Sequence, residues 1–192
     1  MCRRRIILGV CGASGVILGY YLARAVKEQG IELHLIATDA ARRTWELETE
    51  RSFEELTSLA DVNYDPHDMA AAISSGSYRT MGMVVAPCSM KSLAGIVSGY
   101  ADNLLLRAAD VCLKENRRVV LCPREMPLGK VHLRNLNEAV TLGCVIVPPM
   151  LSFYSGQTTV EEQIHHIVGK ILMQFDLEYR EFHPWEGPGA EE

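Results

Sequence analysis

The sequence lacks the cysteine patterns that mark disulfide scaffolds and metal sites. Its six cysteines form no CxxC pair and have no metal-like spacing to histidine. We therefore expect reduced, mostly buried thiols of a cytoplasmic protein. His132, His165 and His166 are expected in surface or core positions, with no metal bound. The cysteines are Cys2, Cys11, Cys88, Cys112, Cys122 and Cys144.

The sequence also lacks an excess of positive charge and a long apolar run. Its net charge is −5, which argues against nucleic acid or an anionic membrane as the main partner. The first apolar stretch is interrupted by Gly-Ala-Ser-Gly at 12–15, too early for a signal peptide or a membrane span. The cytoplasm is the expected compartment.

Internal repeats and low-complexity tracts are missing as well. The 192 residues are 48% hydrophobic, which is enough to bury one full core and gives no reason to expect a second domain. We expect one domain over residues 1–186 and a flexible tail at 187–192.

Five short apolar runs, each closed by small or turn residues, are typical of strands buried on both faces of a parallel sheet. They lie at 6–10, 33–37, 83–86, 119–122 and 144–147. Helical periods occur at 16–29, 40–46, 92–97, 104–115, 131–141 and 160–175. This alternation predicts an α/β fold, a three-layer sandwich with a mostly parallel sheet of the Rossmann-like or flavodoxin-like kind. Residues 63–80 interrupt the alternation and are expected to form a long loop with a short helix.

A glycine-rich turn joins the first predicted strand to the first helix. Gly9, Gly12 and Gly15 have a GxxGxxG spacing, which differs from the GxGxxG spacing of dinucleotide sites. Glycines permit close backbone approach, and amides at a helix start favour a phosphate. The turn therefore favours a mononucleotide such as FMN over NAD, with Thr38 after the second strand as a further contact. The alternative is that the glycines only let the helix pack on the sheet.

A second turn of this type follows the third predicted strand. The stretch Ala-Pro-Cys-Ser-Met-Lys-Ser at 86–92 places hydroxyl groups between a strand and a helix start. Helix-terminal amides and hydroxyls at this edge would hold another part of the same nucleotide. The alternative is that Ser89 or Ser92 only caps the helix.

Eight short motifs follow one another along residues 5–186. They are Gly-Ala-Ser-Gly at 12–15, Glu-Thr at 48–49, Ser-Ser-Gly-Ser at 74–77, Pro-Cys-Ser at 87–89, Arg-Ala-Ala-Asp at 107–110, Pro-Arg-Glu-Met-Pro at 123–127, Phe-Tyr at 153–154 and Pro-Trp at 184–185. As a set they resemble the UbiX family of flavin prenyltransferases. The stretches at 73–77, 87–95 and 123–127 are similar to the small B subunit encoded with non-oxidative hydroxyarylic acid decarboxylases.

The resemblance implies an enzyme that joins a dimethylallyl group, taken from dimethylallyl monophosphate, to N5 and C6 of reduced FMN. It implies that no metal is needed, and the sequence has no DDxxD-like acidic motif to carry one. It further implies a large homo-oligomer, usually a dodecamer, with the site between subunits. The prenylated FMN would serve a UbiD-type decarboxylase, by this resemblance one that acts on a phenolic acid.

The resemblance also assigns the site residues by position. For FMN these are Gly12, Ala13, Ser14, Thr38, Ser89, Met90, Lys91, Ser92 and Arg124. For the prenyl phosphate they are Ser75, Arg107, Lys114, Tyr154 and Lys170. For catalysis they are Ser14, Glu48, Glu125 and Trp185.

Several of these assignments have plainer alternatives. Arg107 and Lys114 lie two turns apart on one helix face, so they could point at one anion or form an ordinary solvated face. Glu125 is expected to accept the C6 proton, but it could instead form a structural ion pair with Arg124. Lys170 stands where an arginine is expected, which keeps the charge and loses the bidentate fork.

Two other functions stay open from the sequence. A flavin carrier or structural subunit of a decarboxylase would not require Ser14, Glu48, Glu125 and Tyr154, which are all present. A flavin-dependent cysteine decarboxylase would carry a catalytic histidine soon after the glycine-rich turn, and residues 16–33 contain none.

Overall fold

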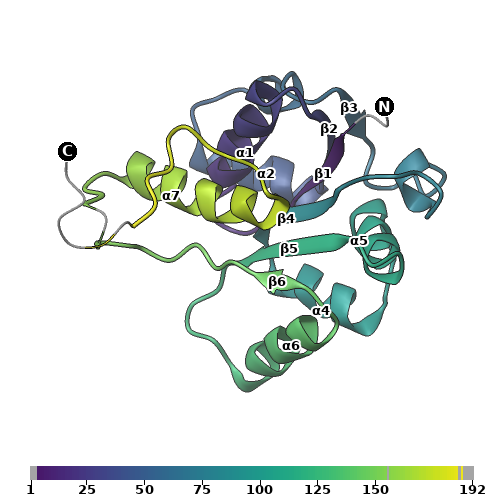
Figure 1. The fold of residues 1–192 in the computed structure, drawn as a ribbon. Coiled ribbons are helices and arrows are strands. Elements are labelled where there is room, and N and C mark those ends of the chain that lie inside the picture. The colour runs from purple at the N-terminus through teal and green to yellow at the C-terminus, as the bar shows by residue number, and fades with distance from the viewer. Residues whose placement is uncertain (1–3, 155, 186, 188–192) are drawn as a thin grey trace.

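The computed structural model describes residues 4–154, 156–185 and 187. Within these residues, six parallel strands form one sheet in the order β3-β2-β1-β4-β5-β6 (Figure 1). The strands are β1 (Arg5–Val10), β2 (Glu32–Ala37), β3 (Val62–Tyr64), β4 (Gly82–Cys88), β5 (Arg118–Pro123) and β6 (Val145–Ile146). The predicted α/β fold with a parallel sheet is confirmed. Cys2 and residues 188–192 of the predicted tail lie outside the described residues.

Helices cover both faces of this sheet (Figure 1). On one face lie α1 (Ile17–Glu28), α2 (Asp39–Glu48), α3 (Phe53–Thr57) and α7 (Val160–Leu172), which continues into the 3-10 turn η2 (Met173–Phe175). On the other lie the 3-10 turn η1 (Ala72–Ser74), α4 (Met90–Ser98), α5 (Leu104–Lys114) and α6 (Lys130–Thr141). No helix of the described chain is both long and apolar enough to cross a bilayer.

The side chains of β1 show how the sheet forms two cores. Ile6, Leu8 and Val10 join the cluster under α1 and α7, whereas Ile7 joins the cluster under α4 and α5. Because helices cover both faces, nearly every position of the strand is buried. Because both faces of the strand are buried, its residues form a continuous apolar run in the sequence.

The structure adds two elements that the apolar pattern does not predict. β3 is a three-residue edge strand paired with β2, and none of its residues is buried, so no apolar run marks it. The expectation of a loop from residue 63 is therefore wrong for its first two residues. α3 has five residues and begins with a capping box between Ser52 and Glu55. The short helix expected within 63–80 is η1.

The strand order reverses between β1 and β4, and the turn after β1 lies at this point. In that turn Gly12 packs against the start of α2. A Cβ atom on Gly12 would lie 2.4 Å from Ala40 Cβ and 2.8 Å from the Ala40 carbonyl carbon. Gly12 therefore sets how closely the turn approaches α2.

We predict that Gly12→Ala lowers the free energy of unfolding by roughly 1–3 kcal/mol, because the backbone of α2 must move to make room. Urea unfolding followed by circular dichroism measures this change. Gly129→Ala is the matched control, since its Cβ would meet nothing nearer than His132 Nδ1 at 3.8 Å. An unchanged midpoint for Gly12→Ala would show that the contact relaxes without cost.

Candidate functional site

Four connections meet at the carboxyl edge of the sheet, around the crossover between β1 and β4. Cys11 N donates to Pro87 O (3.2 Å), and Arg124 N donates to Cys88 O (3.1 Å). Thr38 N donates to Val10 O (3.0 Å). Because parallel strands end at the same edge, all the predicted FMN-binding residues follow β1, β2, β4 or β5 at this one place.

The turn after β1 offers backbone donors, and Glu48 occupies some of them. Its carboxylate, at the end of α2, accepts hydrogen bonds from the amides of Gly15 (2.8 Å) and Val16 (3.4 Å). Gly15 has a φ of +92°, which suits glycine. The amides of Gly12 and Ser14 have no hydrogen-bond partner in the described chain, so they remain available to a ligand. Glu48 therefore stabilises the conformation of the turn through these hydrogen bonds within the chain.

The turn after β4 is organised by two serines. Ser89 caps α4, because its Oγ accepts from Ser92 N (3.2 Å). Its hydroxyl donates to Ser92 Oγ (3.1 Å). The capping alternative therefore applies to Ser89 and not to Ser92. The amides of Met90 and Lys91, in the first turn of α4, have no partner among the described residues and form a second set of free donors.

Two buried thiols, Cys11 and Cys88, connect these turns on their buried side. Cys11 donates to Ser92 Oγ (3.1 Å) and also shares a hydrogen bond with Cys88, which lowers the pKa of the Cys11 thiol to about 7. The same contact, together with burial, raises the pKa of Cys88 well above its usual range. Neither cysteine is in a disulfide.

Thr38 and the residues after β5 complete this edge. Thr38 Oγ1 accepts from Ala41 N (3.1 Å) and caps α2. Arg124 and Glu125 are both exposed, and Glu125 Oε1 accepts from Met126 N (3.1 Å). No ion pair joins Arg124 to Glu125 in the part of the chain that is described, so the structural ion-pair alternative gains no support.

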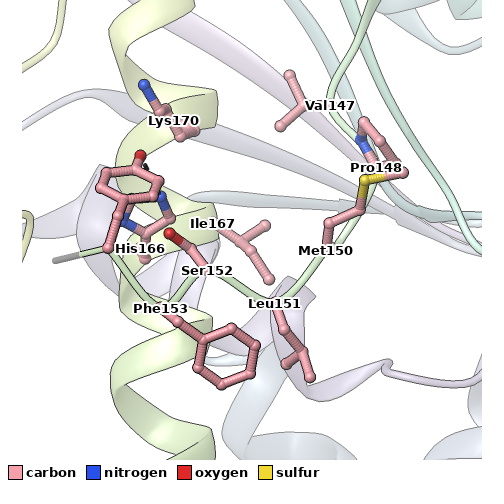
Figure 2. A pocket seen from close by; sticks show the side chains of 10 residues that line it. Val147, Pro148, Met150, Leu151, Ser152, Phe153, His166, Ile167 and Lys170 are labelled. Carbon is pink, nitrogen blue, oxygen red and sulfur yellow. Dashed lines mark hydrogen bonds between the residues drawn. The ribbon is translucent and has the colours of Figure 1, made fainter. Parts of the chain in front are cut away.

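A cavity of about 290 Å³ lies between α7 and the loop that follows β6 (Figure 2). Figure 2 shows His166 and Ile167 on α7 facing the loop that carries Met150 and Ser152, with Lys170 on the same helix. Tyr154 and Lys170, two of the predicted phosphate ligands, both line this cavity.

Aromatic rings gather around Tyr154. The Trp185 ring meets it edge-on at 5.9 Å between centroids, and the His166 ring meets it edge-on at 5.8 Å. Lys170 Nζ lies 5.8 Å from the centroid of the Phe182 ring. The predicted catalytic Trp185 therefore belongs to the Tyr154 side of the molecule.

Gln163, a buried residue on α7, connects the loop after β6 to this helix by hydrogen bonds. Ser152 N donates to Gln163 Oε1 (2.8 Å), and Gln163 Nε2 donates to Ser152 O (2.6 Å). A side-chain amide thus satisfies both backbone groups of one loop residue, and this pair of bonds holds the cavity wall.

The other predicted phosphate ligands form a separate group along α5. Arg107 Nε donates to Ser74 O (3.2 Å). Lys114 Nζ lies 3.1 Å from the position that a Cβ on Gly76 would take. The segment 74–77 therefore runs past both cations and brings Ser75 into the same group.

Carboxylates already neutralise part of this charge. Arg107 pairs with Asp110 (2.6 Å) and Lys114 pairs with Glu115 (3.0 Å). All four side chains are partly exposed, so these pairs can exchange with an arriving anion at little cost.

The two groups of phosphate candidates lie on opposite faces of the sheet. Arg107 and Lys114 belong to α5 and Ser75 directly follows η1, whereas Lys170 belongs to α7 and Tyr154 lines the same cavity as Lys170 (Figure 1). Sequence reasoning placed the five residues on one ligand, and this structure does not bring the two groups together within one chain.

Gln163, which holds the cavity wall, and the place of His166 in the lining of the cavity were not singled out from the sequence. Both side chains are buried, and for His166 this agrees with the core position that was one of its two expected settings. A polar residue inside the apolar stripe of α7 was the available signal. Among the described residues, no three His, Cys, Asp or Glu side chains form a group that could hold a metal ion.

The fold and the nucleotide-type turns define a class, the flavoproteins with a parallel α/β sheet. A family model described as Flavoprotein matches residues 1–176. A probable UbiX-like flavin prenyltransferase from Sedimentibacter hydroxybenzoicus is 56% identical over 184 residues, which cover 95% of this chain and 97% of the relative. The chain therefore belongs to the Flavoprotein family and, within it, to the UbiX-like flavin prenyltransferases.

Two solved structures agree with this assignment. A dodecameric FMN-dependent UbiX-like decarboxylase from Escherichia coli O157:H7 is 49% identical, with a TM-score of 0.93 over 95% of this chain and 100% of that one. AnUbiX (PadA1), solved in complex with FMN and dimethylallyl pyrophosphate, is 44% identical, with a TM-score of 0.94 over 96% of this chain and 98% of that one.

We predict that Gln163→Met, which keeps length and removes both hydrogen bonds, lowers the free energy of unfolding by roughly 1–3 kcal/mol. Because the bonds also hold the loop, amide exchange at Ser152 should accelerate in a hydrogen-exchange experiment. Gln174→Met is the control, since among the described residues the Gln174 side chain donates only to Lys170 O (3.2 Å) and makes no hydrogen bond to the loop. Equal exchange at Ser152 in both variants would contradict the role of Gln163.

Proposed function

We propose that this chain is a flavin prenyltransferase that joins the dimethylallyl group of dimethylallyl monophosphate to N5 and C6 of reduced FMN. The observation that carries the proposal is the meeting of two turns with unpartnered amides at the β1/β4 crossover. The relative solved with FMN and dimethylallyl pyrophosphate supports both kinds of ligand. We take residues 1–186 as the one domain that performs this reaction.

The donors at the carboxyl edge fit a mononucleotide. The amides of Gly12, Ser14, Met90 and Lys91 supply neutral donors, and Arg124 supplies positive charge for the phosphate. When bound, reduced FMN supplies the electron-rich N5 and C6 atoms that become alkylated. The full set proposed to hold it is Gly12, Ala13, Ser14, Thr38, Ser89, Met90, Lys91, Ser92 and Arg124.

Five residues are proposed to bind the prenyl phosphate: Ser75, Arg107, Lys114, Tyr154 and Lys170. Each carries an N–H or O–H donor. As the allylic C–O bond breaks, negative charge collects on the leaving phosphate, and preorganised donors stabilise it. The π face of Trp185 would stabilise the positive charge left on the allyl group.

Three residues are proposed for proton transfer and its geometry. Glu125 accepts the proton that leaves C6 on ring closure, and its exposed position after β5 leaves the carboxylate free to do so. The Ser14 hydroxyl relays a proton at the same edge. Glu48 positions Ser14 by holding the next two amides of the turn.

We infer that the site is completed between copies of a homo-oligomer, because the two phosphate-binding groups lie on opposite faces of the sheet. A dodecamer is the proposed form, as for the relative from Escherichia coli O157:H7. The proposed recipient of the product is a UbiD-type decarboxylase acting on a phenolic acid. The cytoplasm is the proposed compartment, since reducing conditions suit the free, buried cysteines of the described chain.

The decisive experiment is anaerobic incubation of the protein with reduced FMN and dimethylallyl monophosphate. The flavin mass should rise by one C5 prenyl unit. Glu125→Gln should keep FMN and slow the reaction by roughly 10²–10⁴-fold, because the C6 proton loses its acceptor. A parallel run with the pyrophosphate tests donor preference. An unchanged flavin mass would contradict the proposal and favour a flavin carrier or structural subunit, whereas CO₂ release from a peptidyl cysteine would favour a cysteine decarboxylase.

Mixed oligomers test whether the site lies between copies. Lys114→Met and Tyr154→Phe each remove one phosphate donor, so each variant alone should be slow. Subunits of both kinds, dissociated and reassembled together, should regain activity at sites that combine a native Lys114 and a native Tyr154 from different copies. Native protein taken through the same treatment is the control. No gain over the separate variants would contradict a shared site.

A further inference from the structure

His166 and Tyr154 line the same cavity, and both ring nitrogens of His166 make hydrogen-bond contacts. Its Nε2 is 3.4 Å from Tyr154 Oη, and its Nδ1 is 3.4 Å from Gln157 Nε2. The residue is 6% exposed, so water does not compete freely for these contacts. A titratable group that is buried and bonded on both sides has a definite proton arrangement.

The Gln157 contact determines that arrangement. An amide nitrogen can only donate, so His166 Nδ1 must accept and cannot carry a proton. Burial and then the charge of Lys170 lower the pKa of His166, which keeps the ring neutral at neutral pH. The single ring proton is therefore on Nε2, facing Tyr154.

We propose that His166 is a positioning residue that directs the Tyr154 hydroxyl proton into the cavity. With a proton on Nε2, the ring donates to Tyr154 Oη, so the phenolic O–H cannot point at His166. It points instead into the space that Tyr154 shares with Lys170. Tyr154 then donates to an oxygen of the prenyl phosphate, next to the Lys170 ammonium. This inference rests on the proposed function and adds to it the orientation of one phosphate ligand.

The proton arrangement can be measured without any turnover. In ¹⁵N-histidine-labelled protein, solid-state NMR at pH 7.5 should show a neutral Nε2–H ring that is missing from the spectrum of His166→Phe. Gln157→Glu replaces the donor by an acceptor, so it should move the proton to Nδ1. A native His166 signal that is cationic or of the Nδ1–H form would overturn the proposal, whatever the protein catalyses.

Kinetics with dimethylallyl monophosphate and reduced FMN test the consequence. His166→Phe keeps a ring against Tyr154 and should lower kcat/KM about tenfold, the size of one lost hydrogen bond. His166→Gln, whose amide nitrogen replaces Nε2–H, should recover most of the loss. His165→Phe is the matched control, because the neighbouring His165 bonds to Tyr179 (2.6 Å) and should leave kcat/KM unchanged.

The double variant separates a positioning role from a merely structural one. If His166 acts through Tyr154, His166→Phe should cost nothing further in a Tyr154→Phe background. Additive losses, or no recovery in His166→Gln, would overturn the proposal. An inactive native protein with the Nε2–H spectrum would contradict the proposed function and leave the measured proton arrangement intact.

Discussion

The close packing at the β1/β4 crossover is the constraint on which the rest of the site depends. Gly12 lies against the backbone of α2, and a thiol and hydroxyl chain from Cys11 through Ser92 to Ser89 joins the two turns beneath. These contacts bring the first turns of two helices to one edge of the sheet. Because the turns are held by buried groups, their outward amides are left for a ligand.

The residues proposed to bind the prenyl phosphate are arranged differently from those proposed to bind FMN. The residues proposed to hold FMN follow four strands that are neighbours in the sheet, β2, β1, β4 and β5, and all belong to one chain. The cationic residues belong to α5 on one face and α7 on the other. Under the proposed function, packing of subunits is the route by which the two groups would meet on one prenyl phosphate.

The order of strands and helices could be predicted because strands such as β1 and β4 are buried on both faces. Such strands appear in the sequence as continuous apolar runs. The meeting of the glycine and hydroxyl residues at one edge of the sheet could be predicted for a related reason, since these residues directly follow those runs. Edge strand β3 could not, because none of its residues is buried. The separation of Arg107 from Lys170 was also hidden, since spacing along the chain does not tell which face of the sheet a helix covers. The role of Gln163 depends on a loop partner that no pattern within α7 reveals.

Glu48 orders the turn after β1 independently of any ligand. An anion belonging to the chain itself already meets the positive end of α1 and bonds to the amides of Gly15 and Val16. These two hydrogen bonds hold the turn in its conformation. Because the turn is already ordered, a ligand that binds there would lose little free energy in ordering it.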